Sequence, residues 1–396
     1  MKVKEANAQH IVVVIASLGG GGAERVVADL CFYLQEAGRT VTLLTLTGED
    51  ADAYVLAEGI RRERMEIRRA ANSWFDTVRF SFRRFKDIRR RILSLRPDVV
   101  VSFIEQTNVR VAASLIGTGI PVILSERTHP GRHHVSSAWR LTRRLLYRYA
   151  DAVVVQTGTA ADWLRKSTPT RRLVIIPNAV RALVDLGADQ EEDEHLWAGP
   201  YVLAIGRLGK EKGFDLLIEA FARSALADED WRLVVLGEGD ERAALRKQAE
   251  ECGVGGSLEM PGHVRGVGPW LRNADIFALS SRYEGFPNAL VEALQLGCAS
   301  ISFDCESGPS DLIENEQNGL LAPEGDVEAL AFGLRRLASD PDLRKRLSTA
   351  AAISTNARFD RTVVYGKWME LIDAVTSART GPAGSFKDAT APAENR

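Results

Sequence analysis

The sequence is poor in cysteine and has no long hydrophobic run. Its 396 residues include four cysteines whose spacing suggests no pairing, Cys31, Cys252, Cys298 and Cys305. A disulfide framework is therefore not expected, and a reducing compartment is favoured. No apolar stretch approaches the roughly 20 residues of a membrane-spanning helix. The length suits a globular protein of two domains.

Two familiar phosphate-binding signatures are also missing. The glycine-rich stretch at 19–22 is not G-x-G-x-x-G, and no Walker lysine follows it. A dinucleotide-dependent oxidoreductase requires the first signature after a strand and an acidic residue on the next strand, so this enzyme class is disfavoured. The four glycines resemble a phosphate-binding loop, but a tight turn between a strand and a helix explains them at least as well.

The charge balance differs between the two halves of the chain. Residues 1–185 carry 29 Lys and Arg against 18 Asp and Glu, a balance of +11, whereas the remainder carries 22 against 35, a balance of −13. Opposite signs indicate that the halves meet different partners, although unequal surface composition would give the same numbers.

Strands and helices alternate along both halves. The apolar run at 11–18 is typical of a buried strand; lysines before it give it the look of a signal peptide, but a glycine-rich turn and an amphipathic helix follow. The alternation predicts an α/β protein with two doubly wound parallel sheets, whose ligands bind at the carboxyl ends of the strands. Further strands are predicted at 40–48, 98–104, 121–126, 152–157 and 173–180, and in the second half at 201–208, 231–239, 257–264, 276–281 and 299–304.

Two glutamates flank a forced turn in the stretch RYEGFPNALVEA, residues 282–293. Asn288 is expected to cap the helix that begins there, which leaves Glu284 in the loop above the sheet and Glu292 about one turn inside the helix. Free backbone amides between them suit a phosphate, and the carboxylates suit sugar hydroxyls. The pattern therefore indicates a phosphorylated sugar compound. A capped helix with two surface glutamates is the alternative.

A cationic loop follows the first strand of the second half, in the stretch GRLGKEKGF at 206–214. Arg207 and Lys212 stand at the carboxyl end of this strand, where two cations can neutralise a diphosphate. A solvated charged loop is the alternative. Glycine turns also follow two more strands, at 236–240 and 261–263, and three such turns above one sheet favour a binding site over a chance arrangement. The strand ends of this half carry no Asp-x-Asp pair, and we expect no required metal and no cofactor.

A polar loop, SERTHPGRHH at 125–134, follows a strand of the first half. His129 and His133 have a spacing that would suit a metal on a helix, but Pro130 and Gly131 between them prevent a helix. A loop that faces the cleft between the domains is the better interpretation.

The segments GRLGKEKGFDLLIEAF, EGFPNALVE and NGLLAPEGDVEALA together resemble the retaining, nucleotide-sugar-dependent glycosyltransferases of family 4. The resemblance covers about residues 10–375. It implies a GT-B fold, in which two Rossmann-like domains face each other across a cleft. The expected parts are an acceptor-binding domain at 8–184, a linker at 185–199, a donor-binding domain at 200–358, a helix at 359–378 that crosses back to the first domain, and a disordered tail at 379–396.

The same resemblance implies roles for the site residues. Arg207 and Lys212 would hold the donor diphosphate and stabilise its departure. Glu292 would bind the ribose hydroxyls, and Glu284 the transferred sugar. The remaining donor-binding positions are Gly21 and Gly22 on the first domain and Gly237, His263, Val264, Gly285, Phe286, Asn288 and Ala289 on the second.

The first half resembles, more loosely, bacterial enzymes that extend oligosaccharides linked to polyprenyl diphosphate, through VSFIEQTNVRVAAS and PVILSERTH. Several such enzymes have histidine directly after Ser-Glu, where this chain has Arg127, and His129 stands two positions later. Arg127 and His129 are therefore both candidates for a catalytic contact with the donor. The likeness favours a UDP-linked hexose or N-acetylhexosamine as donor and a lipid-linked saccharide as acceptor.

Two arginine-rich helices are predicted in the first half, at 79–98 and 138–151. An apolar face on the sheet explains their periodicity but not their excess of arginine. Anionic lipids and a lipid diphosphate both attract arginine, so we expect a peripheral enzyme on the inner face of the cytoplasmic membrane. Nucleic acid is disfavoured, because the second half is acidic and no binding motif is present. The residues expected to contact membrane or acceptor are Arg83, Arg84, Arg89, Arg90 and Arg91.

The sequence thus predicts a retaining, metal-independent hexosyltransferase of bacterial glycan or polysaccharide assembly. Its catalytic contribution would be to stabilise charge on the departing nucleoside diphosphate. The alternatives are a GDP-mannose-dependent mannosyltransferase and a non-catalytic sugar-nucleotide-binding scaffold. The scaffold is disfavoured because both cations and both glutamates are present.

Overall fold

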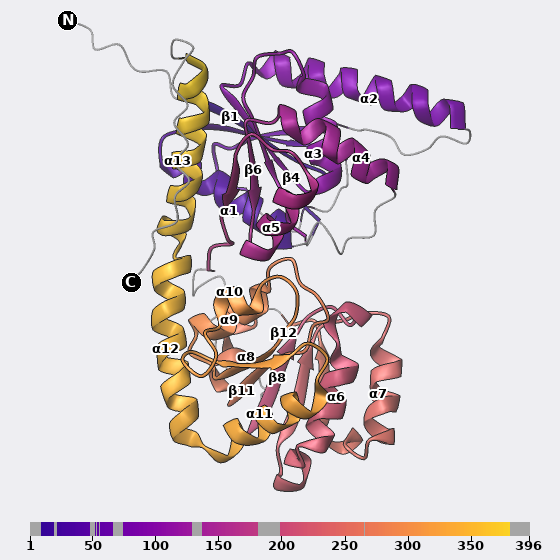
Figure 1. Cartoon of the computed structure of the whole chain (residues 1–396), viewed down its shortest axis with the longest axis vertical. Coiled ribbons are helices and arrows are strands. Elements are labelled where there is room, and N and C mark those ends of the chain that lie inside the picture. The colour runs from indigo at the N-terminus through magenta and orange to yellow at the C-terminus, as the bar shows by residue number, and fades with distance from the viewer. Residues whose placement is uncertain are drawn as a thin grey trace, which may run out of the picture.

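The computed structural model shows two lobes, one above the other, with two long C-terminal helices along one side (Figure 1). In the described part of the chain, the first lobe holds a seven-stranded parallel sheet and the second a six-stranded one. The predicted fold class is therefore confirmed. The structure describes residues 9–19, 22–47, 52, 54, 56–65, 74–128, 137–180, 199–264 and 266–380, with the backbone alone at 74–82, 137–138 and 379–380.

The first sheet is buried between two layers of helices, with strand order β3-β2-β1-β4-β5-β6-β7. In β1 (His10–Ile15) the odd-numbered apolar residues pack with helices α1 and α13, and the even-numbered ones with α2 and α3. The prediction of a buried strand in this apolar run is confirmed. The other elements are α1 (Gly22–Glu36), β2 (Thr40–Thr45), β3 (Arg61–Arg64), α2 (Trp74–Leu95), β4 (Val99–Phe103), α3 (Glu105–Leu115), β5 (Val122–Ser125), α4 (Ser137–Leu146), η1 (Tyr147–Tyr149), β6 (Ala152–Val155), α5 (Gly158–Ser167) and β7 (Leu173–Ile175).

The second sheet has the strand order β10-β9-β8-β11-β12-β13, and all of its strands are parallel. Its five predicted strands are present, and the edge strand β13 (Leu320–Pro323) was not predicted. The other elements are β8 (Tyr201–Ile205), η3 (Lys210–Lys212), α6 (Phe214–Arg223), η4 (Leu226–Glu229), β9 (Arg232–Leu236), α7 (Arg242–Glu251), η5 (Gly255–Ser257), β10 (Leu258–Gly262), α8 (Gly268–Asn273), β11 (Ile276–Leu279), α9 (Asn288–Gln295), β12 (Ser300–Asp304), α10 (Pro309–Leu312) and α11 (Val327–Ser339).

Two consecutive helices connect the lobes on one side of the molecule. Helix α12 (Pro341–Phe359) lies along the second lobe, and α13 (Arg361–Thr380) runs up the first (Figure 1). Trp368 of α13 is fully buried in the core of the first lobe, with its ring centroid 5.6 Å from that of Phe103. Helix α13 ends at Thr380, two residues after the expected end of the crossing helix at 378. The expected linker at 185–199 lies outside the described residues except for its last position.

The carboxyl ends of the two sheets face each other. The chain reverses its winding direction between β1 and β4 in the first sheet, and between β8 and β11 in the second. Ligands of such sheets bind in the crevice at this switch point. The loops after the strands also touch across the lobes, since the hydroxyl oxygens of Thr157 and Ser307 are 2.8 Å apart. The fold therefore brings the two switch points to one interlobe site.

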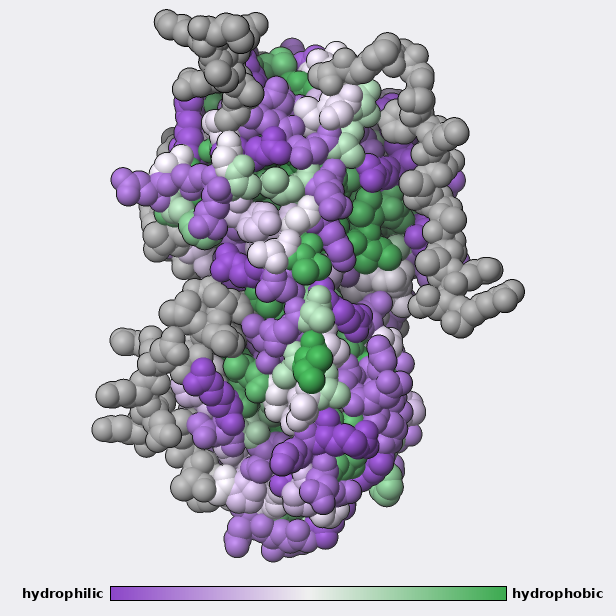
Figure 2. Space-filling view, turned by 90° about the vertical axis from the view of Figure 1, so that its left-hand side faces the viewer, coloured by the Kyte–Doolittle hydropathy of each residue, from purple (hydrophilic) through white to green (hydrophobic). Residues whose placement is uncertain are grey.

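The outer surface carries both hydrophilic and hydrophobic residues. Figure 2 looks onto the side that carries α12 and α13, where hydrophilic residues cover most of the second lobe and hydrophobic residues occupy smaller areas. Within the described ranges, no helix has both the length and the apolar character needed to cross a bilayer. All four cysteines are free thiols.

Candidate active site

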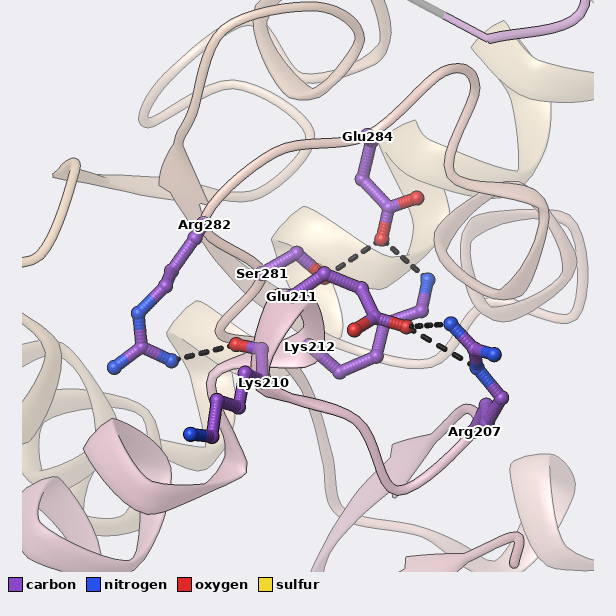
Figure 3. A network of polar contacts seen from close by, with 7 residues as sticks. All are labelled: Arg207, Lys210, Glu211, Lys212, Ser281, Arg282 and Glu284. Atoms are coloured by element: carbon purple, nitrogen blue, oxygen red, sulfur yellow. Dashed lines mark hydrogen bonds and ion pairs between the residues drawn. The ribbon is translucent and has the colours of Figure 1, made fainter. Parts of the chain in front are cut away.

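Lys212 and Glu284 form an ion pair above the switch point of the second sheet (Figure 3). Lys212 Nζ donates to Glu284 Oε1 over 2.7 Å, and Ser281 Oγ donates to the same oxygen over 2.6 Å. The two residues follow β8 and β11, which are neighbouring strands, and this adjacency brings together two motifs that lie 72 positions apart. Glu284 is buried, so it is not the surface glutamate of the alternative interpretation.

Backbone contacts and a second ion pair hold these two loops against each other. Arg282 forms two bonds with the carboxylate of Asp215, at 2.7 and 2.6 Å, and donates to the carbonyl of Lys210 over 2.7 Å. Gly213 has a φ of +62°, and a Cβ at this position would lie 2.1 Å from the carbonyl oxygen of Ser280. Only glycine allows so close a backbone approach, so the loop that presents Lys212 is fixed in position.

Arg207 extends into solvent, with 75% of its side chain exposed, and pairs with Glu211 over 2.6 Å. Its hydrogen bonds with Glu211 raise the pKa of the guanidinium above its ordinary value. In this structure, then, the two predicted cations contact different carboxylates. Gly237 is a structural requirement, because a Cβ there would lie 1.9 Å from the carbonyl oxygen of Gly206.

The start of α9 differs from its predicted geometry. Asn288 is the first residue of the helix, Pro287 occupies the N-cap, and no side chain caps the helix. The Asn288 amide donates to the Phe286 carbonyl over 2.9 Å, because Pro287 (φ −80°, ψ 80°) closes a tight three-residue turn. The predicted cap was therefore wrong, and this amide is already used. Phe286 itself is buried, 6.2 Å from the ring of Phe359.

Asn288 instead takes part in a polar chain between the lobes. Its Oδ1 accepts from Asn178 Nδ2 over 2.7 Å, and Asn178 Oδ1 in turn accepts from Arg127 and from Gln156, each over 2.7 Å. Arg127 is buried, with its guanidinium 4.7 Å from the ring centroid of Phe103. Burial lowers the pKa of Arg127 to about 9. The structure thus ties this candidate catalytic residue to the interlobe contact.

Glu292 also contacts the opposite lobe. Arg25 of α1 donates to Glu292 Oε1 over 2.8 Å, and both side chains are largely buried. The starts of α1 and α9 approach closely, since a Cβ on Gly22 would lie 3.1 Å from Asn288 Nδ2. Arg25 stands three residues after the glycine-rich stretch at 19–22. Nothing in this local sequence indicates that the arginine reaches the second lobe.

A buried polar cluster lies behind the carboxyl ends of β4 and β5. Arg143 pairs with Glu105 over 3.0 Å, and the hydroxyl of Tyr147 donates to the Glu126 carboxylate. Burial raises the pKa of Glu126 to about 7, and the nearby charge of Glu105 acts in the same direction. Arg143 belongs to the arginine-rich helix predicted at 138–151, and its burial departs from the expected outward-facing arginines.

The remaining described positions of the predicted donor site lie in the loops after β10 and β11 and at the start of α9. His263 is exposed and Val264 is half-buried, directly after β10. The backbone of Gly285 lies against the first lobe, because a Cβ there would be 2.7 Å from the carbonyl oxygen of Arg127. Ala289 is half-buried near the start of α9. Gly21 and His129 lie outside the described residues. Among the described His, Cys, Asp and Glu side chains, no group of three is placed to hold a metal ion.

Two family profiles match the chain in succession. The profile described as Glycosyltransferase Family 4 matches residues 20–182, and that described as Glycosyl transferases group 1 matches residues 189–353. The lipopolysaccharide core biosynthesis glycosyltransferase LpsD of Rhizobium meliloti is 30% identical over 364 residues, which cover 91% of this chain and 97% of that protein. This chain belongs to the family 4 glycosyltransferases.

A further relative is a glycosyltransferase by name, and solved structures match the fold. A Campylobacter jejuni protein named GalNAc-α-(1→4)-GalNAc-α-(1→3)-diNAcBac-PP-undecaprenol α-1,4-N-acetyl-D-galactosaminyltransferase is 27% identical over 369 residues, covering 93% of this chain and 99% of the relative. Sucrose-phosphate synthase from Thermosynechococcus elongatus superposes with a TM-score of 0.79 at 18% identity, over 93% of this chain and 100% of the other. Anabaena HepE in complex with UDP and glucose gives 0.74 at 16%, over 92% and 99%. These structures share the GT-B fold with this protein.

Proposed function

We propose that this glycosyltransferase transfers a hexose or N-acetylhexosamine, with retention, from a nucleotide-diphosphate sugar to a polyprenyl-diphosphate-linked saccharide. The observation that carries the proposal is the Lys212–Glu284 ion pair at the switch point of the second sheet. It places a cation for phosphate and a carboxylate for sugar hydroxyls side by side, within a chain that belongs to the family 4 glycosyltransferases.

Departure of the nucleoside diphosphate requires a positive environment at its oxygens. Lys212 is held near this position, and the exposed Arg207 can turn from Glu211 towards an entering diphosphate. When Lys212 transfers its contact from Glu284 to a phosphate oxygen, it frees a further acceptor position of the carboxylate for hydroxyls of the transferred sugar. Positioned cations of this kind stabilise the developing charge without a metal, so we propose a metal-independent reaction.

The identity of donor and acceptor is supported by relatives. The Campylobacter relative is named for transfer of N-acetylgalactosamine to a saccharide on diphospho-undecaprenol, and a second one from the same organism bears a closely similar name. HepE was solved with UDP and with UDP-glucose. We therefore favour a UDP-linked donor and an undecaprenyl-diphosphate-linked acceptor.

The first lobe would attach the enzyme to the membrane, but the structure changes which arginines can do so. Arg89 donates to the carbonyls of Ser114 and Ile116 over 2.9 Å each, and Arg91 pairs with Glu63. These two hold α2 against its neighbours. Of the five arginines named for membrane contact, Arg84 is half-buried, whereas Arg83 and Arg90 are exposed.

Helix α4 and the turn after it supply a better membrane-facing surface. Leu141 is 57% exposed, and Leu145 and Tyr149 are 44% exposed, at spacings of four along one face. Exposed arginines stand beside them at 140, 144 and 148. An apolar stripe next to a basic one is the pattern of a helix that lies on an anionic bilayer. In Figure 1 this helix lies on the side of the first lobe opposite α13.

A donor panel tests the proposed function. The enzyme is incubated with UDP-, GDP- and ADP-sugars and a short-chain polyprenyl-diphosphate saccharide, and released nucleotide and glycolipid product are measured. We expect release from a UDP-hexosamine or UDP-hexose, an α-linked product from an α-linked donor, and no loss of rate with EDTA. Release from GDP-mannose alone would establish the alternative donor, and binding without release would indicate a scaffold.

A further inference from the structure

An ion pair links the two lobes at the proposed ribose site. Arg25 Nη1 lies 2.8 Å from Glu292 Oε1, with side-chain exposures of 14% and 8%. Pairs on open surfaces are screened by water and contribute little, whereas a pair withdrawn from water is costly to break on one side only. This contact is therefore expected to influence how the lobes close.

The surroundings of the pair show that both lobes are already fitted together here. Asn178 of the first lobe donates to Asn288 of the second over 2.7 Å, and Gly22 at the start of α1 lies close to the same Asn288 side chain. These contacts lie four residues before Glu292 and three before Arg25 in the sequence. Closure of the lobes at the start of α9 therefore determines whether Arg25 can reach Glu292.

Both members of the pair have hydrogen-bonding capacity beyond their mutual contact. A carboxylate has about four lone-pair positions, so Glu292 can accept from Arg25 and from ribose hydroxyls at the same time. Within the described residues, Nε of Arg25 is buried and has no hydrogen-bond partner. A buried N–H without a partner is unfavourable, and an oxygen of a bound donor would satisfy it.

We propose that Arg25 is a positioning residue for the nucleotide-sugar donor. It holds the Glu292 carboxylate in place for the ribose and couples occupation of that site to closure of the first lobe over the second. The inference rests on the proposed function, since it assumes that a nucleotide ribose binds at Glu292. It adds a residue of the first lobe to the donor site.

The first test separates donor binding from turnover. Arg25→Gln, Arg25→Lys and the control Arg39→Gln are assayed with the donor that the wild-type enzyme uses. Arg39 is a suitable control because it lies just after the same helix and pairs with Asp373 of α13, away from α9. We expect Arg25→Gln to raise the donor KM about tenfold or more with a smaller change in kcat, Arg25→Lys to recover part of the loss, and Arg39→Gln to resemble wild type.

Two kinetic outcomes would overturn the proposal. An unchanged donor KM in Arg25→Gln would show that the contact does not position Glu292. A lowered donor KM would show that Arg25 competes with the ribose. A variant that merely folded poorly would lose active enzyme without moving KM, and the Arg25→Lys variant checks the same point with the charge retained.

The second test does not depend on the donor. Hydrogen exchange of the free enzyme is compared between wild type and Arg25→Gln at the starts of α1 and α9. Faster exchange at both helix starts in the variant is expected, and equal exchange would rule out the closing role whatever the substrate. If the wild-type enzyme released nucleotide from no donor, the proposed function would fail while this contact could still be measured.

Discussion

At the scale of single residues, the charged groups of the site are paired with one another. Lys212 contacts Glu284, Arg207 contacts Glu211 and Arg25 contacts Glu292. Donor binding would exchange the partners of Lys212 and Arg207, whereas the contact between Arg25 and Glu292 is proposed to persist. Such an exchange avoids placing an unpaired charge in a partly buried cleft at any stage.

Removing either cation should mainly slow the reaction. We expect Lys212→Ala and Arg207→Ala each to lower turnover by roughly 10²-fold or more, the scale of losing one group that stabilises developing charge. Lys247→Ala is a matched control, because Lys247 pairs with Glu251 on the exposed surface of α7. Near-normal turnover of both cation variants with a confirmed donor would contradict the diphosphate assignment.

The two glutamates should differ in their kinetic effects. Glu284→Ala should mainly lower kcat, because this carboxylate lies beside Lys212, where the reacting sugar is proposed to bind. Glu292→Ala should mainly raise the donor KM, since ribose contacts change little during the reaction. Steady-state kinetics with varied donor separate the two effects, and the reverse assignment of kcat and KM would exchange the proposed roles.

Glu126 should make the stability of the protein depend on pH. Its pKa is raised from 4.5 to about 7 by burial beside Glu105. The folded protein therefore binds a proton more tightly than the unfolded chain, and this stabilising contribution is complete below about pH 4.5 and lost as pH rises to about 7. The full change is about 3 kcal/mol, from about 1.4 kcal/mol per pKa unit.

The measurement compares unfolding free energies of wild type and Glu126→Gln by urea titration at several pH values. Glutamine keeps the shape of the side chain but does not titrate, so the difference between the two proteins should change between pH 4.5 and 7 and level off above it. A difference that is constant across this range would mean that Glu126 is ionised in the folded protein at all these pH values.

At the scale of elements, α4 shows that a contact with another element can bury a polar residue that the helical pattern of apolar residues would place on the surface. The helix predicted at 138–151 was expected to place an apolar face on the sheet, with its arginines facing outwards. Tyr147 is buried as an apolar face requires, but Arg143 also points into the lobe, where it meets Glu105, and Leu145 is on the surface. A buried carboxylate needs a partner, and Arg143 supplies it.

The exposed stripe of α4 should contribute to membrane binding. Leu141→Ser combined with Leu145→Ser should reduce co-sedimentation with anionic liposomes several-fold, because each leucine contributes roughly 1.5–3 kcal/mol when fully removed from water. Phe332→Ser on α11 of the second lobe, itself 70% exposed, is the control for loss of a surface apolar residue. The comparison of liposome binding holds only for variants whose donor affinity equals that of the wild type.

Arginine replacements test the charge component separately. Arg144→Ser on α4 and Arg90→Ser on α2 leave the described cores intact, because both side chains are exposed. Arg89 and Arg91 are unsuitable because they hold α2 in place. If wild-type protein ignores anionic liposomes at low salt, or the leucine variant binds them as well as wild type, the membrane surface lies elsewhere or does not exist.

At the scale of the whole molecule, the first lobe depends on the end of the chain. Trp368 is buried in its core beside Phe103, which lies 265 positions earlier in the chain (368 − 103). Trp368→Ala should destabilise the protein by about 3–5 kcal/mol, the range for removing a large buried aromatic side chain. Glu370→Ala, an exposed change in the same helix, is the control. Thermal or urea unfolding with equal midpoints for the two variants would contradict this packing.

The sequence by itself determined the parts of this protein that depend on local pattern. Continuous apolar runs predicted the central strands of both sheets, because a strand buried on both faces needs apolar residues at every position. Turn residues placed Glu284, Lys212 and Arg207 at strand ends. The edge strand β3 was not predicted, because its four residues are all charged and an edge strand has less need of an apolar pattern. The edge strand β13 is apolar but only four residues long, which is too short for a clear pattern.

Only the tertiary structure decided which charged and polar side chains become partners. Three such contacts join elements that are distant in sequence. They are the pairing of Glu292 with Arg25, the burial of Arg143 inside the first lobe, and the hydrogen bond of Asn288 with Asn178. Local periodicity cannot specify such partners. An arginine has the same local preference on a surface as in a buried pair, and its surroundings are fixed only when the sheets twist, the lobes close and α13 returns to the first core.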